Sequence, residues 1–353
     1  MLGYNNHIVN MHKIFLILSL CLGCLSVGAQ VQRGFIIKGE VNIPDGYSVG
    51  LCCHTDTSFS VSIADGWVKG GKFELKGKLD HPLSGTLMTN NLELVGKNNW
   101  PTDSIRWTYT DVFISNDDIF VDKNLKVTGG QVQTDFNEYQ AIKAKNDGES
   151  ADWSFIDSHP QSVISVYLAN NLLKRGYNLT PEQVAHLERT ITSVPGDPIR
   201  MEEFRQRIAY AKKTTKGGEL VDLELKDVNG KLCHLINIVP KNQYVLVDFW
   251  ASWCGICLAA MPEVKKLAEE YKGKISVVGV SIDTKQEAWT KAMEKHPEPW
   301  PQYITTAKGY DDLFHKYQVG NGVPYYLMIT PDGKVLGSPS GPEEVREILQ
   351  KYE

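Results

Sequence analysis

Two cysteines, Cys254 and Cys257, stand three residues apart in the segment FWASWCGIC. Pairs with this spacing bind metals, attach haem, form structural crosslinks, or alternate between a dithiol and a disulfide. A zinc site usually adds a second Cys or His pair, and Cys233 with His234 lacks the internal spacing of one. Haem attachment requires a His after the second cysteine, where this chain has Leu258. The pair therefore favours redox exchange over a metal or haem site.

Two further alternatives have physical arguments against them. A structural disulfide that closes so short a loop gains little stability from chain entropy. A peroxidatic cysteine of the peroxiredoxin type has Thr three residues before it and Pro seven residues before it. This chain has Ala251 and Val247 at those places.

The position of the pair predicts different roles for its two thiols. Cys254 lies where a predicted buried strand ends and a helix begins. The free N–H groups and the positive dipole end of the helix stabilise a thiolate, so we expect the pKa of Cys254 to fall below its ordinary value of about 8.5. Cys257 lies one turn further along the same face, where the dipole has less effect and burial is greater. We therefore expect Cys254 to be the nucleophile and Cys257 the resolving thiol.

The elements that position this pair belong to residues 217–353, where strand and helix patterns alternate. A hairpin around Asn229-Gly230 is followed by the apolar strand QYVLVDFWA, and GICLAAMPEVKKLAEEYKG predicts a helix that contains Pro262 and ends before Gly273. A second buried strand, KISVVGVSID, a helix, TKQEAWTKAMEKH, a hairpin, PYYLMITPDGKVLGS, and a final helix follow. This alternation predicts an α/β layered fold with a partly parallel sheet.

Residues 31–130 have a different pattern, typical of short strands. The segment GFIIKGEVN alternates apolar and polar residues before the turn Pro44-Asp45-Gly46. Three short runs separated by Asp-Gly and Gly-Gly follow in SFSVSIADGWVKGGKFELKGKL. Hairpin signals at such short spacing predict a small, sandwich-like all-β domain.

Residues 131–216 are predicted to form a helical connector. The segment SVISVYLANNLLKR has apolar residues at helical spacing. Thr180 and Gln183 are placed as a capping box, with a proline between them at the first helical position. Asp197 precedes another proline and predicts the start of a further helix.

The composition limits the classes of function. The 353 residues are enough for about two domains, and 42% of them are hydrophobic. The formal net charge is -5, and the chain has no long basic run, which argues against nucleic acid as a partner. No metal or organic cofactor is implied, because the two cysteines are themselves a redox centre.

The amino-terminus predicts export. Residues 1–29 are typical of a signal peptide: Lys13 precedes the apolar run IFLILSLCLGCLSVGA, and small residues end at Ala29. The mature chain would then start at Gln30, and translation starts at Met11 in an alternative reading. The apolar run is too short to span a membrane, and we expect no membrane span elsewhere. The predicted location is the periplasm or cell envelope, where stable disulfides persist.

Lipid attachment at Cys24 is an alternative form of processing. A lipid-attachment site normally has a small or aliphatic residue three positions before the cysteine, where this chain has Cys21. Lipid attachment is therefore not favoured. Removal of the signal peptide leaves five cysteines, an odd and scattered set that is not a disulfide framework. We expect Cys52, Cys53 and Cys233 to be packed, unreactive residues.

The motifs resemble those of a known family. The segment LVDFWASWCGIC, followed by MPEV, is similar to the TlpA/ResA-like thiol–disulfide oxidoreductases of the thioredoxin family. The segment VGNGVPYYLMITPDGKVLG resembles their second signature, whose proline, here Pro324, is cis and faces the cysteine pair. VSIDTKQEAWTKAMEKHPEPWPQ and FIIKGEVNIPDGYSV resemble Bacteroidetes-type members that carry a β-rich amino-terminal domain of unknown function. The resemblance implies an α/β thioredoxin fold at the carboxy-terminus, after the all-β domain and the helical connector.

The chain departs from the family pattern at four positions. Ile256 replaces the usual proline before the second cysteine, and Leu258 replaces a charged residue after it. Ala260 stands where an acid usually precedes the MP pair, and Tyr325 follows the proline where Thr or Ser is common. These differences concern the redox potential and the choice of partner rather than the basic chemistry.

The resemblance also implies roles for residues around the cysteines. Asp248 would be a buried acid that accepts the proton of Cys257, although a carboxylate at a strand edge that faces water is the alternative. A cis peptide at Pro324 would expose the backbone of Val323 to an extended substrate by strand addition; otherwise the proline only opens a strand. Trp250 is expected in the core, and Trp253 in an apolar rim around the cysteines.

We therefore predict an envelope thiol–disulfide oxidoreductase that reduces or exchanges disulfides of partner proteins. The predicted catalytic residues are Cys254, Cys257 and Asp248, and the predicted substrate-binding residues are Trp253, Gly255, Ile256, Val323 and Pro324. Its partners would be disulfide-containing envelope proteins and an upstream electron donor, and the oligomeric state is left open. The alternatives are a non-catalytic binding or scaffold protein with the same fold and a thiol peroxidase-like antioxidant protein.

Overall fold

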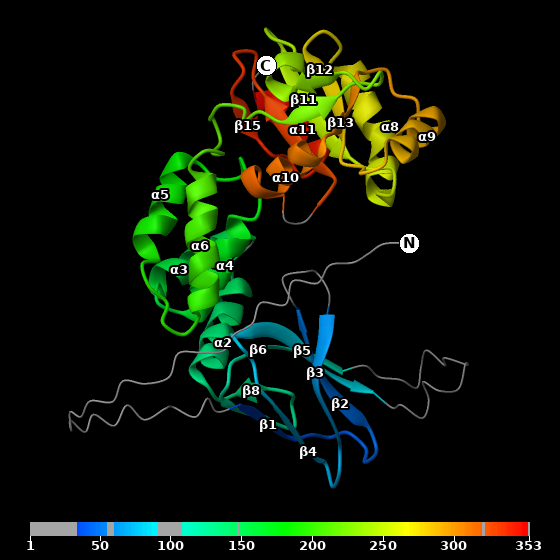
Figure 1. Ribbon diagram of the computed structural model, residues 1–353. Coiled ribbons are helices and arrows are strands. Elements are labelled where there is room, and N and C mark those ends of the chain that lie inside the picture. The colour runs from blue at the N-terminus through cyan, green and yellow to red at the C-terminus, as the bar shows by residue number, and fades with distance from the viewer. Residues whose placement is uncertain (1–33, 55–59, 91–107, 147, 320–321, 352–353) are drawn as a thin grey trace, which may run out of the picture. The chain divides into compact units, whose positions relative to one another are not determined.

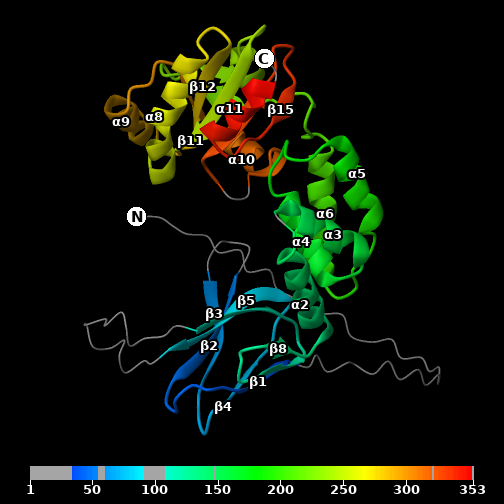
Figure 2. The same ribbon diagram turned by 180° about the vertical axis from the view of Figure 1, so that it is seen from behind.

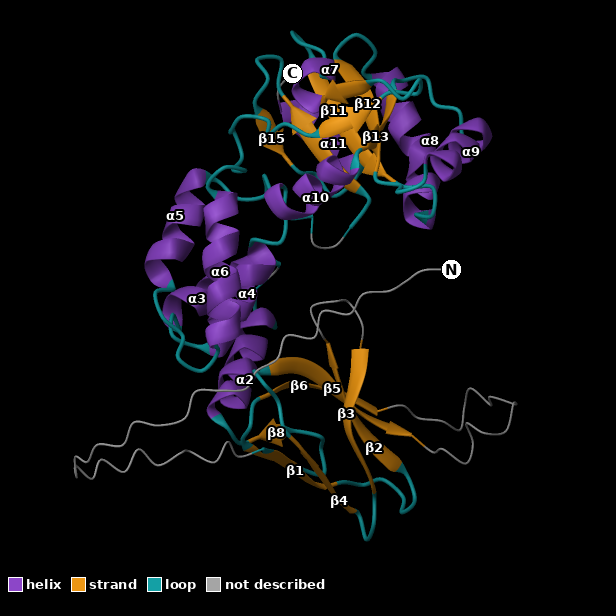
Figure 3. Cartoon of the chain, in the orientation of Figure 1, coloured by secondary structure: helices purple, strands orange, loops and turns teal. Residues whose placement is uncertain are grey.

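The structure is a computed structural model of the chain, shown from opposite sides in Figures 1 and 2. It describes residues 34–54, 60–90, 108–146, 148–319 and 322–351. The predicted signal peptide, its cleavage position and the alternative lipid site at Cys24 lie outside the described residues. Three regions follow one another along the chain, rich in strands, in helices, and in both (Figure 3).

The amino-terminal region is a β-sandwich, which confirms the predicted all-β domain. Alternate residues of the strands point inward, so that Phe35, Ile37, Leu51 and Val112 share one buried core contributed by two sheets. In the described residues, one sheet has the order β4-β1-β7-β8 and the other the order β3-β2-β5-β6. The strands are β1 Phe35–Glu40, β2 Ser48–His54, β3 Ser60–Trp67, β4 Lys72–Gly77, β5 Leu83–Asn90, β6 Thr108–Ile114, β7 Asp118–Val121 and β8 Val127–Thr128.

The helices between the two strand-containing regions start with α2 at Gln131 and have their own buried core. The capping box of Thr180 and Gln183 is present at the start of α5, and Asp197 caps α6 by accepting a hydrogen bond from the backbone N–H of Arg200. Both helices therefore begin at the N-cap residues that the sequence predicts. The helices are α2 Gln131–Lys143, α3 Glu149–Ser158, α4 Val163–Leu172, α5 Pro181–Thr190 and α6 Pro198–Ala211.

The carboxy-terminal region has the predicted α/β thioredoxin fold. Its described strands form one mixed sheet with the order β10-β9-β13-β12-β11-β14-β15. The strands are β9 Glu224–Lys226, β10 Leu232–His234, β11 Tyr244–Trp250, β12 Ile275–Ser281, β13 Gln302–Thr305, β14 Tyr325–Ile329 and β15 Val335–Gly337. The helices are α7 Leu235–Ile238, α8 Gly255–Glu270, α9 Gln286–Lys295, α10 Ala307–Lys316 and α11 Pro342–Lys351.

The central strand of this sheet, β11, sets the geometry of the site. It pairs in parallel with β12 and antiparallel with β14, and it has cores on both of its faces. Val247 and Phe249 point into one core, whereas Leu246 points into the other core together with Val264 and Leu267 of α8. Because side chains alternate along a strand, Asp248 lies on the same face as Leu246, toward α8.

Candidate active site

The two cysteines lie at the junction of β11 and α8. The strand ends at Trp250, a short loop follows, and the helix begins at Gly255 with Cys254 as its N-cap residue. Cys254 and Cys257 form a disulfide with an S–S distance of 2.05 Å and a Cα–Cα distance of 5.2 Å. The structure therefore represents the oxidised form of the pair.

The helix terminus acts directly on the sulfur of Cys254. The backbone N–H of Cys257 donates a hydrogen bond to Cys254 Sγ, over 3.2 Å. The first turn of α8 contains no acidic residue that would oppose a negative charge there. In the reduced form, the same donor and the positive end of the helix dipole stabilise a thiolate on Cys254.

Exposure does not distinguish the two sulfurs. Cys254 is 6% exposed and Cys257 is 3% exposed, so the expected greater burial of Cys257 amounts to little. The carbonyl of Val323, in the loop before β14, lies against Cys254 Sγ. The assignment of the nucleophile therefore depends on the helix terminus rather than on access to solvent.

An exposed apolar rim surrounds the buried disulfide. The side chains of Trp253 and Ile256 are 66% and 73% exposed, among the most exposed large hydrophobic residues of the described chain. Gly255 is also exposed, and a Cβ atom at this position would meet no neighbouring atom within 4 Å. Trp250 is 1% exposed and belongs to the core, in agreement with its predicted role. The rim offers apolar surface beside the cysteines to another molecule.

The loop before β14 lies against the first cysteine. The Val323–Pro324 peptide bond is cis, and the carbonyl oxygen of Val323 lies 3.6 Å from Cys254 Sγ. Both residues are half-buried. The structure thus brings Val323, Pro324 and the disulfide together, although Val323 lies 69 positions after Cys254 in the sequence.

Tyr325, the residue after the cis-proline, does not line this surface. It is 1% exposed, its ring packs against Phe249 with centroids 5.5 Å apart, and its hydroxyl donates to the carbonyl of Gly176 over 2.9 Å. The tyrosine therefore offers no hydroxyl to a substrate, which a Thr or Ser at this place is positioned to do.

Asp248 is a buried acid, 3% exposed, on the face of β11 toward the helix that carries Cys257. Burial, and to a smaller degree the nearby carboxylate of Glu298, raise the pKa of Asp248 from 3.8 to about 7. Its Oδ1 atom has no hydrogen-bond partner among the described residues. A carboxyl group with this pKa exchanges its proton near neutral pH, as a general base for a thiol requires.

Glu298 is a residue of this site that our sequence analysis did not identify. It lies between α9 and β13 and is half-buried, and burial raises the pKa of its carboxyl group. Its Oε2 atom is also buried without a partner among the described residues. No local sequence pattern marks this residue, because 50 positions separate it from Asp248.

Removal of the Glu298 charge should shift the titration of Asp248. In a Glu298→Gln protein the pKa of Asp248 should fall, by less than about one unit because burial is the larger cause. The pH midpoint of mixed-disulfide resolution should fall with it, in a stopped-flow series from pH 5 to 9. Glu294→Gln, on the exposed side of α9, is the matched control. An unchanged midpoint would show that the two carboxyl groups do not interact.

The other cysteines among the described residues take no part in the site. Cys52, Cys53 and Cys233 are free thiols in the structure. Cys53 is fully buried, and burial raises its pKa to about 11, which suppresses the reactive thiolate form. Within the described residues, no group of three His, Cys, Asp or Glu side chains is arranged to hold a metal ion, and no helix is long and apolar enough to cross a membrane.

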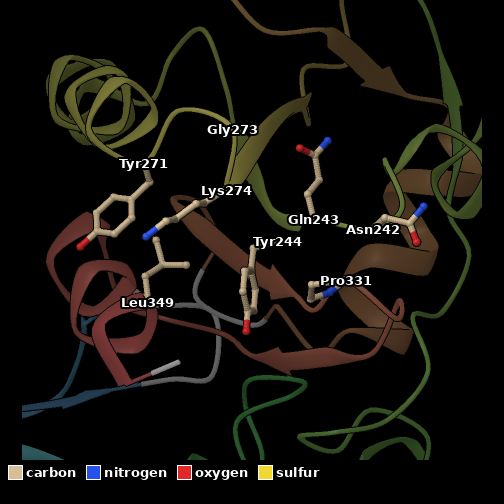
Figure 4. Close-up of a pocket in the computed structure, with 8 residues that line it drawn as sticks. All are labelled: Asn242, Gln243, Tyr244, Tyr271, Gly273, Lys274, Pro331 and Leu349. Atoms are coloured by element: carbon tan, nitrogen blue, oxygen red, sulfur yellow. The ribbon is translucent and has the colours of Figure 1, made fainter. Parts of the chain in front are cut away.

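A separate hollow lies at the other end of the central strand. It has a volume of about 360 Å³ and is bordered by Tyr244, Tyr271, Pro331 and Leu349, among others (Figure 4). Tyr244 begins β11, whereas the cysteines follow its last residue. No cysteine or acidic side chain lines this hollow. It therefore contributes nothing to the redox chemistry.

Comparisons with known proteins agree with this geometry. Residues 242–335 match the model of a family described as thioredoxin-like. Thioredoxin 1 of Chlorobaculum tepidum is 50% identical over 44 residues, which are 12% of this chain and 44% of that protein. The thiol–disulfide oxidoreductase ResA of Bacillus cereus is 28% identical over 145 residues, which are 41% of this chain and 80% of that protein. The chain spans less than half the length of the first curated relatives that it matches.

Solved structures resemble parts of the chain. A thiol:disulfide interchange protein from Bacteroides sp. has 26% identity, covers 39% of this chain and 89% of its own, and gives a TM-score of 0.35. A thioredoxin-like protein from Bacteroides caccae has 13% identity, covers 62% of this chain and 84% of its own, and gives a TM-score of 0.47.

Proposed function

We propose that this chain, a thioredoxin-fold protein of the TlpA/ResA type, is a thiol–disulfide oxidoreductase whose redox centre is Cys254 with Cys257. One observation carries the proposal above the others: the disulfide stands at a helix N-terminus, with Cys254 Sγ accepting the N–H of Cys257 and lying against the Val323 carbonyl. A structural crosslink requires neither a thiolate-stabilising donor nor an adjacent backbone edge.

The reaction follows from the two sulfurs and the buried acid. The reduced Cys254 thiolate attacks one sulfur of a partner disulfide, the partner S–S bond breaks, and the leaving sulfur takes up a proton from solvent. Asp248, in its carboxylate form, accepts the proton of Cys257. The Cys257 thiolate then attacks Cys254 Sγ, which releases the second partner thiolate and forms the Cys254–Cys257 disulfide. Two electrons pass from the pair to the partner, and a dithiol donor must return them.

The surface around the disulfide suits an extended polypeptide. Strand addition beside the cis-proline would use the backbone of Val323, which lies next to Cys254. The apolar rim of Trp253 and Ile256, with Gly255 between the cysteines, would pack against the side chains of the partner. Because the rim is apolar and the backbone contact is general, the site favours unfolded or extended disulfide-containing proteins over a single small molecule.

We further propose that the protein acts in the cell envelope, on disulfide-containing envelope proteins, and is recharged by an upstream electron donor. The signal-peptide pattern of residues 1–29 supports this location, since an exported protein meets partners whose disulfides persist. A lipid anchor at Cys24 is the less favoured form of the same proposal.

Reduction of insulin by dithiothreitol tests the proposed activity. The wild-type protein should accelerate the precipitation of the reduced insulin B chain, whereas Cys254→Ser should not. A Cys233→Ser protein, which changes one of the free thiols, is the control and should match the wild type. A wild-type protein with no effect on the uncatalysed rate would instead favour a non-catalytic binding protein.

The pair should have a reducing potential. The two intervening residues, Gly255 and Ile256, offer no charge and no side-chain donor to the Cys254 thiolate, so that the helix terminus alone stabilises it. We expect a potential nearer the value of about -270 mV of thioredoxin than the value of about -120 mV of DsbA. Equilibration with a glutathione series, followed by thiol counting, measures it. A value above about -150 mV would contradict the expectation.

A further inference from the structure

We propose that Asp283 is a positioning residue that acts through Ser252 to fix the loop presenting Trp253 and Cys254 to a partner protein. The inference rests on the proposed function and extends it to a residue outside the cysteine motifs. Asp283 lies two residues after Ser281, the last residue of β12, and is 3% exposed, and Ser252 lies in the loop between β11 and α8.

Asp283 holds Ser252 through both oxygens of its carboxylate. The backbone N–H of Ser252 donates to Asp283 Oδ2 over 2.8 Å, and the Ser252 hydroxyl donates to Asp283 Oδ1 over 2.6 Å. The buried hydroxyl of Ser281 also donates to Asp283 Oδ2, over 2.7 Å, and accepts the N–H of Asp283 over 3.0 Å. Three donors converge on one buried carboxylate, and hydrogen bonds to an ionised acceptor are about twice as strong as neutral ones.

The backbone on either side of Ser252 is also held. The N–H of Ile282 donates to the carbonyl of Trp250 over 2.9 Å, and the N–H of Cys254 donates to the carbonyl of Ala251 over 3.0 Å. The Asp283 contact lies between these two bonds, one residue before Trp253 and two before Cys254. It thereby links the end of β12 to the loop that sets the direction of both side chains.

This link has a functional consequence because the direction of the Trp253 side chain depends on the backbone of the loop. The indole is 66% exposed, so few neighbours fix its position, and its direction follows from the loop backbone. A loop that is already ordered loses less conformational freedom when a partner protein binds. The disulfide chemistry at Cys254 depends on the helix terminus and Asp248, whereas the hydrogen bonds of the Asp283 carboxylate go to Ser252 and Ser281. Loss of Asp283 should therefore weaken protein docking more than sulfur chemistry.

Two substitutions separate position from charge. Asp283→Ala removes all of the acceptors. Asp283→Asn removes the charge but keeps one oxygen for the Ser252 N–H, while its NH₂ group can donate to a reoriented Ser252 hydroxyl. If Asp283 acts by position, Asn should retain most of the wild-type behaviour. If its negative charge acted on the Cys254 thiolate, Asn and Ala should behave alike.

The test compares a large and a small disulfide substrate. Steady-state reduction of insulin and the rate of the reduced protein with 5,5′-dithiobis(2-nitrobenzoate) are measured for each variant. Asp283→Ala should raise the KM for insulin about tenfold, equivalent to about 1.4 kcal/mol. Its rate with the small disulfide should stay within about twofold of the wild type. Asp283→Asn should lie close to the wild type with both substrates.

Matched variants complete the design. Thr330→Ala removes a hydroxyl that accepts a backbone N–H, over 3.0 Å, in the β14–β15 turn at the opposite end of the sheet, and should change neither rate. Trp253→Ala should also raise the KM for insulin, and its effect should not add to that of Asp283→Ala, because both act through the same loop. Thermal unfolding shows which variants fold. If Asp283→Ala does not fold, Ser252→Ala is compared with the wild type on the same two substrates instead.

The outcomes are distinct. A wild-type protein that does not reduce insulin overturns the proposed function, and the inference with it. An active wild type with an unchanged KM in Asp283→Ala, or with equal losses on both substrates, overturns the inference alone. Equal behaviour of Asn and Ala would assign the effect to charge and would also overturn it.

Discussion

Replacement of Cys257 by Ser should turn a transient intermediate into a stable covalent complex. Cys254 would still attack a partner disulfide, but no second thiol would stand within bonding distance to release the partner. Intramolecular groups react with effective concentrations far above those of external thiols, so the release rate should fall by about 10³-fold or more. Non-reducing electrophoresis and mass spectrometry of the adducts measure the accumulated complex.

The companion variant assigns the order of the two sulfurs. Cys254→Ser should form no adduct, because Cys257 lacks the helix-terminus stabilisation that its own N–H provides to Cys254. Adducts linked through Cys257, or through Cys233, would contradict the assignment. A Cys257→Ser protein with wild-type turnover would show that the pair does not act as nucleophile and resolver.

Replacement of Asp248 by Asn should slow resolution and change its pH dependence. In the wild type, the base form of Asp248 becomes available as the pH rises through about 7, so resolution should accelerate through that range and then level off. In Asp248→Asn the acceleration should move to the more alkaline range in which a thiol ionises without a neighbouring base, about 8.5 for a free cysteine. Near pH 7 we expect resolution to be slower by about 10². Equal profiles from pH 6 to 9 would remove Asp248 from the mechanism.

The same substitution should stabilise the fold. Because the pKa of Asp248 is raised from 3.8 to about 7, the folded protein holds a proton between these pH values that the unfolded chain releases. The free energy of unfolding therefore falls as the pH rises from about 4 to about 7, and the loss is complete above pH 7. Asn carries no charge, so Asp248→Asn should be more stable there by on the order of 4 kcal/mol. Urea unfolding at pH 5 and 8 measures the difference, which should be larger at pH 8.

A gain in stability with a loss of activity would mark Asp248 as a functional rather than a structural residue. A buried charge that destabilises the fold persists where the chemistry requires it. Lower stability of Asp248→Asn at pH 8 would show instead that the carboxylate contributes to packing.

Local patterns in the sequence predicted much of the fold. The capping box at Thr180, the hairpin around Asn229-Gly230 and the strand–helix junction before Cys254 all depend on residues close together in the chain, and the structure has them where expected. The β-sandwich followed from short runs of alternating residues between turn signals. These features were accessible because periodicity and turn residues act over a few positions.

Contacts between distant segments were not accessible in the same way. Glu298 approaches Asp248, the indole of Trp250 donates to Gln302 over 3.0 Å, and Asp283 holds Ser252, each across some 30 to 50 positions of sequence. No local pattern marks such pairs. The cis peptide before Pro324 was expected only from the family resemblance. Because cis bonds occur at only about 5–6% of X–Pro positions, the residues alone would have favoured trans. The near-complete burial of Cys254 was not predicted, because the Val323 carbonyl that lies against it comes from a segment 69 positions away.

A single-turnover measurement tests the central claim most directly. Fully reduced protein is mixed with one equivalent of insulin, quenched with acid and alkylated, and the thiols of each peptide are counted by mass spectrometry. The account predicts that Cys254 and Cys257 each lose a thiol to a shared disulfide while insulin gains two thiols, with Cys52, Cys53 and Cys233 unchanged. Unchanged insulin disulfides, or oxidation at the other cysteines in place of this pair, would contradict it.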